Sequence, residues 1–470
     1  MRKLWRNLMR GAGYVKRHLG HWLLKFDVER FFTFGYICSS PQRQLTVGYL
    51  SYFLIGGVLL CLPFMLCGDV SFVDNLFTAI SAVSTTGLST VDVSADYTFW
   101  GQLLILLLIQ LGGIGYMTLS TFVMYRVTHH FVGVRAGAFR KQFSLPENFS
   151  AGDMAASILK YTLFFEAAGV LLLYPIFRSE GVEGPLWSAV FHSISAFCTA
   201  GFSIFPDNLV RFAGNVPLNL VIMVLSYAGA MGFIVISDLW RKVSERAHRI
   251  TFTTKVILSI TLIVTLWGTF HLYFFEPSFA GFAPGKRLMV SVFQTMSAMT
   301  TVGYNTVDVG SVMPLSLFVL TVIMYVGASP SGTGGGLKST TVSAVFAYVK
   351  SRLGLRREVT LAGRRIPAYR VDDALTIFVF YTVVLFFGTY LLTMTEGGRS
   401  GFLPLMFEAA SALGTVGLSS GVSATLTTAG KLVLIVLMFV GRVGVVTIGN
   451  AMLMRMEREG NRSREDDLAV

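Results

Sequence analysis

Long apolar segments, separated by short polar or glycine-rich stretches, dominate the chain from residue 45 onward. Most of them approach or exceed the roughly 20 residues that an α-helix needs to cross the hydrocarbon core of a bilayer. The pattern therefore predicts eight membrane helices. They are expected over Leu45–Leu66, Phe99–Tyr125, Ile158–Phe177, Leu218–Trp240, Val256–Phe275, Leu315–Val326, Leu375–Leu392 and Leu432–Val446.

The motif F-x-x-x-S-A-x-x-T-x-G recurs four times between pairs of these segments. It spans Phe77–Gly87, Phe191–Gly201, Phe293–Gly303 and Phe407–Gly417. The first copy begins within an amphipathic stretch, Ser71–Val83, and continues beyond its end. This stretch is too short to cross a bilayer, so we expect a re-entrant helix followed by a loop. Irregular backbone at membrane depth is tolerated only where protein buries it or water reaches it. The motif therefore predicts four equivalent loops at the mouth of a pore.

The order of membrane helix, re-entrant pore helix, loop and membrane helix recurs in all four parts of the chain. This predicts an all-α integral membrane protein whose four repeats, with eight membrane helices and four pore helices, surround one central pore. We expect a basic arm at 1–44, repeats at 45–126, 150–240, 251–349 and 371–455, and a tail at 456–470.

The motif loops carry residues suited to binding a dehydrated monovalent cation. Backbone carbonyls from four symmetric loops can replace a hydration shell, and glycine gives the backbone the conformations that this requires. The expected filter residues are Thr85, Thr86, Gly87, Thr199, Ala200, Gly201, Thr301, Val302, Gly303, Thr415, Val416 and Gly417. We also expect hydrogen bonds from the motif serines to brace the re-entrant helices. These serines are Ser81, Ser195, Ser297 and Ser411.

A glycine-rich stretch interrupts the second membrane helix of the third repeat. The other second helices share a G-x-x-G pattern, at Gly112–Gly115, Gly229–Gly232 and Gly441–Gly444. The run from Gly327 to Lys338 contains too many glycines, and a proline, to form a continuous helix, so we expect a loop that lines a cavity. Arg442 lies at the same level, and a charge within the membrane is a functional candidate. The expected gate residues are Gly327, Gly332, Gly334, Gly335, Gly336, Lys338 and Arg442.

Three other features receive a structural interpretation. Gly332–Ser339 nearly matches a phosphate-binding loop, but Leu337 replaces the required glycine and no strand precedes it. Glu166 is expected to pair with Lys160, or alternatively with Arg442. The four cysteines fall in no metal-binding spacing and are interpreted as unpaired packing or lumen-facing residues. The histidines are scattered and form no predicted catalytic or metal site.

The distribution of charge predicts the topology. Only 14% of residues are charged, against roughly 25% in soluble domains. The net charge is +12, and the basic residues concentrate in 1–45, 126–145, 241–255, 350–370 and 455–464. By the positive-inside rule these segments and both termini are cytoplasmic, and the motif loops lie on the opposite side. The basic excess therefore reflects topology and predicts no nucleic-acid partner.

The four motif copies, spread over about residues 45–455, resemble the Trk/Ktr/HKT superfamily of potassium transporters, in which one polypeptide carries four such units. The count of eight membrane helices is most similar to the Ktr-type membrane subunit. In this family a glycine in every loop goes with potassium preference, whereas a serine in the first loop goes with sodium transport. The glycines at all four positions therefore imply potassium as the ion held at the filter.

The resemblance implies further properties. Gly327–Lys338 resembles the intramembrane gating loop of the family, and Arg442 resembles its arginine in the fourth unit, which contributes to the permeation barrier. The implied partners are a second copy of the chain and a cytosolic nucleotide-binding regulatory ring. We expect no cofactor and no other metal, and a location in the plasma membrane, the inner membrane of a bacterium.

The sequence leaves alternatives to potassium uptake. One is a sodium-selective or sodium–potassium symporting member of the same superfamily. Another is an ATP-dependent pump that binds phosphate at Gly332–Ser339. A third is a secondary carrier with broken helices at the bilayer midplane, which does not require four copies of one loop.

Overall fold

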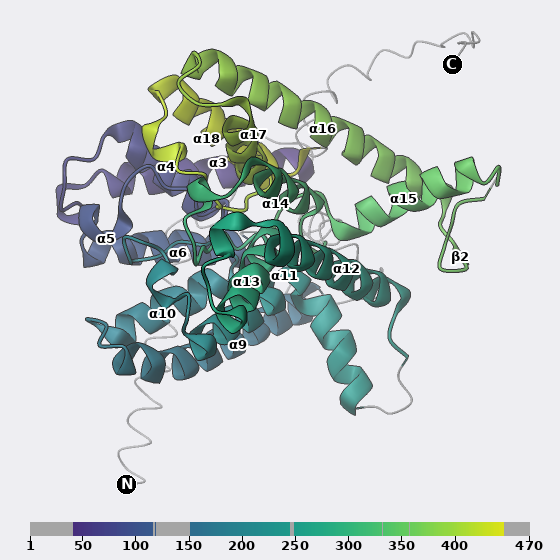
Figure 1. Cartoon of the computed structure of the whole chain (residues 1–470), viewed down its shortest axis with the longest axis horizontal. Helices are drawn as coiled ribbons and strands as arrows, with labels where there is room; N and C mark the ends of the chain where they lie inside the picture. The colour runs from purple at the N-terminus through teal and green to yellow at the C-terminus, as the bar shows by residue number, and fades with distance from the viewer. Residues whose placement is uncertain are drawn as a thin grey trace, which may run out of the picture.

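The computed structural model describes residues 41–115, 118, 151–244, 249–330, 332–356 and 358–445. Most of the predicted basic arm, the basic loop at 126–145 and the tail at 456–470 lie outside these ranges. Within them the chain is mostly helical, as predicted, and Figure 1 shows the helices gathered into one bundle. A two-stranded antiparallel sheet, β1 (Thr360–Leu361) and β2 (Arg364–Arg365), lies between two of the helices.

Each repeat contains a first helix, a pore helix that carries the motif, and a second helix. The first helices are α3 (Pro41–Leu60), α9 (Ala151–Ser179), α12 (Phe252–Phe275) and α16 (Ala368–Glu396). The pore helices are α4 (Phe72–Val83), α10 (Pro185–Phe197), α13 (Pro284–Thr300) and α17 (Phe402–Leu413). The second helices are α6 (Phe99–Ile114), α11 (Val216–Ser244), α14 (Pro314–Val326) with its continuation α15 (Ser339–Leu353), and α18 (Thr428–Val443).

Local sequence explains where these helices begin. The hydroxyl of Ser71 accepts a hydrogen bond from the backbone N–H of Asp74 and caps α4. Thr98 and Thr427 cap α6 and α18 in the same way. Proline occupies the first turn of α10, α13 and α14, where its missing N–H removes no helical hydrogen bond.

The four repeats close into a ring. Each pore helix packs against the first helix of its own repeat and against the second helix of the preceding repeat. The contacts between repeats are α10 with α6, α13 with α11, α17 with α14, and α4 with α18. The last pair joins the end of the chain to its beginning, as Figure 1 shows where yellow α18 lies beside purple α4. The predicted arrangement of four units around one axis is therefore confirmed.

The outside of the ring is apolar. Phe164 and Leu171 of α9 are 67% and 76% exposed, and Ile263 of α12 is 63% exposed. Large exposed apolar surfaces of this kind mark contact with a membrane or a partner. Four described helices are long and apolar enough to cross a bilayer: Ala156–Ser179, Val216–Ser244, Phe252–Phe275 and Ala368–Glu396. The chain is an integral membrane protein.

The expectation of continuous second helices outside the third repeat is wrong. Gly115 and Gly444 end α6 and α18 with φ of 80° and 93°, and Gly232 interrupts α11 with φ of 75°. These are the second glycines of the three G-x-x-G pairs, and glycine adopts positive φ without steric cost. Gly327 of the third repeat corresponds to the first glycine of these pairs. The break in that repeat therefore comes three residues earlier, at Gly327, with φ of 59°. In the described residues every second helix thus ends or kinks at a glycine with positive φ.

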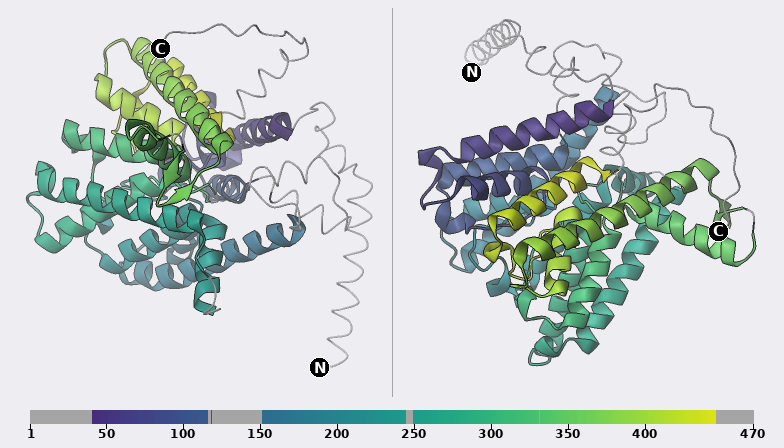
Figure 2. Two further views of the ribbon diagram at one scale, coloured as in Figure 1. Left: turned by 90° about the vertical axis from the view of Figure 1, so that its right-hand side faces the viewer. Right: turned by 90° about the horizontal axis from the view of Figure 1, so that it is seen from above.

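The third repeat ends in a long helical hairpin. Helix α15 packs against the start of α16, with β1 and β2 at the tip, and this hairpin extends away from the ring (Figures 1 and 2). The rest of α16 packs against α17 and α18 within the ring. Ala347, Val359 and Val371 form a small apolar core that holds it together. Its surface is basic, and the exposed arginines among its described residues are Arg352, Arg356, Arg364, Arg365 and Arg370.

A half-buried ion pair closes the ring between the first and last repeats. Lys431 Nζ lies 2.6 Å from Asp74 Oδ1, and the two side chains are 16% and 13% exposed. Asp74→Asn is expected to lower the free energy of unfolding by roughly 1–3 kcal/mol, because the ammonium loses its charged partner. The measurement is thermal unfolding of the purified protein in detergent. Asp207→Asn is the control, because its pair with Arg211 is 36% and 45% exposed and contributes only about 0–1 kcal/mol. Equal effects of the two variants would contradict this prediction.

Candidate functional site

The four motif loops share one unusual backbone conformation. Thr85, Thr199, Thr301 and Thr415 have φ of 54°, 52°, 58° and 46°. A β-branched residue in the left-handed region is an outlier that costs about 1–2 kcal/mol. The same strain at four equivalent positions indicates that function, rather than stability, requires it.

Hydrogen bonds at the end of each pore helix hold this conformation. In the first repeat the N–H of Thr86 donates to the carbonyl of Ser81 at 2.8 Å, and the N–H of Thr85 donates to Ala82 at 3.0 Å. This is the Schellman arrangement, with threonine in the position that glycine usually occupies. The N–H groups of Ala200, Val302 and Val416 make the equivalent bond to the motif serine of their own repeats.

The motif glycines bring the four loops into a closed ring of contacts. A methyl group added to Gly87 would lie 2.2 Å from the carbonyl oxygen of Ala200 in the next repeat. A methyl group added to Gly201 would lie 2.1 Å from the carbonyl oxygen of Val302. The corresponding distances are 2.2 Å from Gly303 to the oxygen of Val416 and 2.1 Å from Gly417 to the oxygen of Thr86. A carbonyl oxygen therefore lies at each of the four junctions, and no side chain fits at the glycine positions. The sequence-predicted filter residues of all four repeats come together in this ring.

The motif serines brace the loops in two different ways. Ser81 and Ser411 accept hydrogen bonds from the N–H groups of Gly87 and Gly417, at 3.1 and 3.0 Å. Ser195 and Ser297 instead donate to the carbonyls of Phe202 and Tyr304, at 2.9 and 2.6 Å. The predicted serine hydrogen bonds are present, and they link each pore helix to its own loop.

The ring of loops can stabilise a cation. Each pore helix ends directly before its loop, so the negative end of its dipole lies beside the ring. Oxygen atoms of the threonine hydroxyls and of the loop carbonyls are the ligands that alkali cations accept in selective pores. The arrangement supplies partial negative charge without a carboxylate, which suits an ion that must bind and then leave.

The Gly327–Lys338 loop, in which Ser331 is not described, lies against the filter threonines. The N–H of Gly335 donates to Thr301 Oγ1 at 2.9 Å, and Thr333 Oγ1 lies 3.0 Å from Thr199 Oγ1. A methyl group added to Gly335 would meet Thr415 Oγ1 at 2.0 Å. The loop therefore packs against three of the four threonine hydroxyls.

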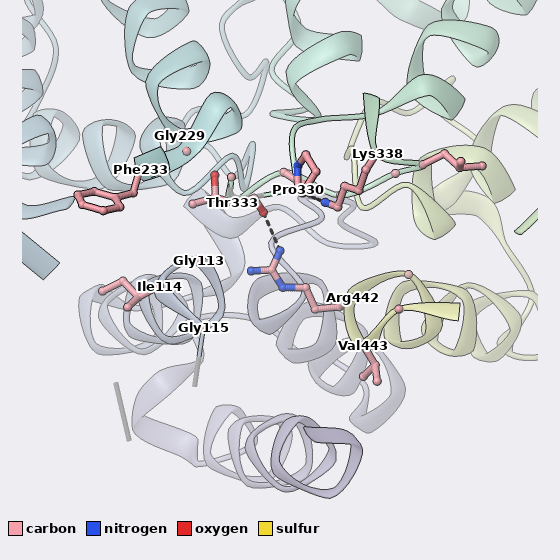
Figure 3. A pocket seen from close by; sticks show the side chains of 18 of the residues that line it. Gly113, Ile114, Gly115, Gly229, Phe233, Pro330, Thr333, Lys338, Arg442 and Val443 are labelled. Carbon is pink, nitrogen blue, oxygen red and sulfur yellow. Dashed lines mark hydrogen bonds between the residues drawn. The ribbon is translucent and has the colours of Figure 1, made fainter. Parts of the chain in front are cut away.

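Arg442 contacts the fourth threonine and the loop together. Its Nη1 donates to Thr85 Oγ1 at 3.0 Å and to the carbonyl of Thr333 at 2.7 Å, and its Nη2 donates to the carbonyl of Gly112. Figure 3 shows the guanidinium of Arg442 directed at Thr333. The Gly112 carbonyl lies in the last turn of α6, where it also accepts a hydrogen bond from the N–H of Gly115 at 3.2 Å.

A cavity of about 360 Å³ lies beside this loop. Arg442, Thr333 and Lys338 line it together with Gly115, Gly232 and Gly444 of the other second helices. Lys338 Nζ donates to the carbonyl of Gly334 at 2.6 Å, so this lysine stabilises the loop from within. The predicted gate glycines line the same cavity, except Gly327, which packs against Gly335 and Gly336.

The resemblance to a phosphate-binding loop does not extend to the structure. A methyl group at Gly332 would lie 1.9 Å from the carbonyl oxygen of Ala230, and one at Gly334 would lie 2.8 Å from that of Thr300. These glycines pack against protein backbone, so they leave no room for a phosphate group there.

The expected ion pair between Glu166 and Lys160 is wrong. Glu166 is 5% exposed, and its carboxylate accepts a hydrogen bond from Gln110 Nε2 at 3.0 Å, whereas Lys160 is exposed. Six helical residues separate the two positions, which places them on different faces of α9. The alternative partner, Arg442, bonds to Thr85 and to backbone carbonyls instead.

The cysteines behave as expected where the structure describes them. Cys61, Cys67 and Cys198 form no disulfide, and Cys38 lies outside the described residues. Thr333 is a residue that the sequence analysis missed. A hydroxyl in an otherwise glycine-rich run was its signal, because such a side chain can bond to a filter threonine.

Known proteins are similar to this chain over most of its length. Residues 63–463 match the family model TrkH, described as cation transport protein. The chain is 34% identical to the Ktr system potassium uptake protein B of Vibrio alginolyticus, over 89% of this chain and 92% of the relative. It is 32% identical to the protein of the same name from Bacillus subtilis, over 87% and 92% of the two chains.

Two further similarities concern another relative and a solved structure. The potassium/sodium uptake protein NtpJ of Enterococcus hirae is 32% identical, over 89% of this chain and 94% of the relative. The crystal structure of the potassium transporter TrkH from Vibrio parahaemolyticus matches with a TM-score of 0.70 and 20% identity, over 90% of this chain and 86% of that chain. The latter similarity supports the fold.

Proposed function

Because this chain belongs to the TrkH family of cation transport proteins, we propose that it takes up potassium across a cell membrane as the ion-conducting subunit of a Ktr-type system. The observation that carries the proposal is the ring of four Thr-x-Gly loops, with a strained threonine and a side-chain-free glycine in each. A ring of carbonyl and hydroxyl oxygens replaces the hydration shell of a monovalent cation. The membrane potential drives the ion inward, at about 2.3 kcal/mol per charge per 100 mV.

The Gly327–Lys338 loop and Arg442 form the gate of this pathway. They engage the same threonine hydroxyls that an ion would use at the inner end of the filter. The loop and the ion therefore compete for these oxygens, and the guanidinium repels a cation at short range. Conduction requires the loop to leave the threonines and Arg442 to withdraw.

The proposed assembly is a homodimer with a cytosolic nucleotide-binding regulatory ring. The relatives' names refer to a Ktr system, which supports a partner subunit. The exposed arginines of the α15–α16 hairpin suit an acidic partner surface, and by the positive-inside rule they support a cytoplasmic position of this hairpin. Both termini then lie on the cytoplasmic side, in a plasma or bacterial inner membrane.

The test is cation flux into proteoliposomes that contain the purified chain, with potassium compared with sodium. Potassium flux that exceeds sodium flux supports the proposal. Equal fluxes would favour the second candidate, a sodium-selective or symporting transporter, which the similarity to a potassium/sodium uptake protein supports. Flux that requires ATP with the purified chain alone would favour a pump and contradict the proposal.

A further inference from the structure

Each pore helix has a buried polar side chain at one equivalent position of the motif. The residue directly after the motif phenylalanine differs in every repeat, yet each copy is at most 1% exposed. These residues are Thr78, His192, Gln294 and Glu408. Most polar side chains with so little access to water are hydrogen-bonded within the protein.

In three repeats that partner is a loop residue two or three positions after the motif glycine. His192 Nε2 lies 3.0 Å from Ser203 Oγ, and Gln294 Nε2 donates to Thr306 Oγ1 at 3.4 Å. Glu408 Oε1 accepts from Ser419 Oγ at 2.8 Å. In the first repeat the loop is held from one turn earlier on the pore helix, where Asp74 accepts from Thr90 Oγ1 at 2.6 Å.

Glu408 makes the most extensive of these contacts. Its Oε1 also accepts from the N–H and the hydroxyl of Ser420, at 2.8 and 3.0 Å, and its Oε2 bonds to Ser423 Oγ at 2.5 Å. None of the ion pairs found in the described ranges includes Glu408. The carboxyl group of Glu408 is thus buried without a cation, and hydrogen bonds from a single loop segment compensate for its burial.

The partners of Glu408 show what these bonds restrain. Glu408 lies in the middle of α17, whereas its donors belong to residues 419–423, beyond Gly417. The carboxyl group therefore ties the segment after the glycine to the pore helix before it, while Ser411 holds the N–H of Gly417 itself. The position of the fourth loop in the ring depends on both attachments.

We propose that Glu408 is a positioning residue that holds the outer half of the fourth filter loop and thereby sets the preference of the filter for potassium over sodium. This inference rests on the proposed function of the loops as a filter. A selective site must hold its ligands within about 0.5 Å of their working geometry. A loop that can relax around the smaller sodium ion no longer distinguishes potassium from sodium.

The test compares Glu408→Gln with Glu396→Gln. Glu396 is a matched control, because it is 2% exposed and belongs to the same repeat, but its carboxylate accepts hydrogen bonds from Thr427 at the start of α18. Two readouts are measured on both variants and on the unaltered protein. One is the ratio of potassium to sodium flux in proteoliposomes, and the other is hydrogen exchange of the backbone amides of residues 417–425.

Glu408→Gln is expected to lower the flux ratio by about tenfold and to speed exchange of the Ser420 amide by a similar factor, because an amide cannot replace every acceptor of the carboxylate. Glu396→Gln should change neither. Unchanged exchange in Glu408→Gln would overturn the proposal, and so would a flux ratio that falls equally in both variants. Faster exchange with an unaltered flux ratio would also overturn it, since the loop would then be held without effect on selectivity.

A variant on the loop side guards against misfolding of Glu408→Gln. Ser419→Ala with Ser423→Ala removes two donors and keeps the glutamate, and it should lower the flux ratio in the same direction. Adding these changes to Glu408→Gln should have little further effect if the residues act as one unit. Failure of the proposed function is recognised separately, because unaltered protein would then show no preference for potassium, while hydrogen exchange would still report whether Glu408 holds the loop.

Discussion

Gly303→Ser is expected to reduce potassium flux at least about tenfold and to remove the preference for potassium over sodium. Gly303 has φ of 80°, and a Cβ atom at this position would lie 2.2 Å from the carbonyl oxygen of Val416. The backbone strain alone is worth about 1–2 kcal/mol, and the contact forces the neighbouring loop to move as well. Since the Val416 carbonyl belongs to the next repeat, the damage spreads around the ring.

Potassium and sodium flux into proteoliposomes at equal protein content measures this effect. Gly181→Ser is the control, because Gly181 also has positive φ, 70°, but a Cβ atom there would have no neighbour within 4 Å. The control should lose a similar amount of backbone stability and keep its selectivity. Selective potassium flux in Gly303→Ser would contradict the assignment of the filter.

Arg442→Ala is expected to raise potassium flux about tenfold or more in the absence of any partner. Arg442 donates hydrogen bonds to Thr85, Thr333 and Gly112, so its removal frees the gate loop and a filter hydroxyl at once. It also removes a positive charge from the pathway. A unit charge about 4 Å from an ion contributes roughly 4 kcal/mol of repulsion at an effective dielectric constant of 20.

Two further variants separate charge from structure. Arg442→Lys keeps the charge but cannot span the same three acceptors, so its flux should lie between those of the unaltered protein and the alanine variant. Arg442→Met removes the charge and keeps much of the length. Flux in Arg442→Ala that equals the unaltered protein, at the same amount of folded protein, would exclude the arginine from the gate.

Much of the architecture could be predicted from the sequence, because the physical constraints were local and repeated. Apolar length identified the membrane helices, and the short stretch before each motif identified the pore helices. The four motif glycines predicted a ring of loops, because only glycine permits such close approach of backbones. Because the motif occurs four times with the same flanking pattern, the prediction of a loop at each copy is supported by the other three.

The fine structure of the site depended on contacts between distant residues. The residue after the motif phenylalanine is variable in the sequence, since the four copies share no residue type there. The structure shows that burial and a loop partner are what three of these copies have in common. The pattern could not show this, because each side chain meets a different donor or acceptor.

Local sequence properties and long-range contacts determined different features of this protein. The sequence by itself determined the helices, the four loops, the interruption at Gly327 and the presence of Arg442 in the membrane, because hydropathy and glycine content act along the chain. Only the tertiary structure decided that the second helices end or kink at glycines with positive φ, that Glu166 bonds to Gln110, and that Arg442 joins Thr85 to the gate loop. The last two are contacts between different repeats, and packing of the repeats into a ring brings these residues within hydrogen-bond distance.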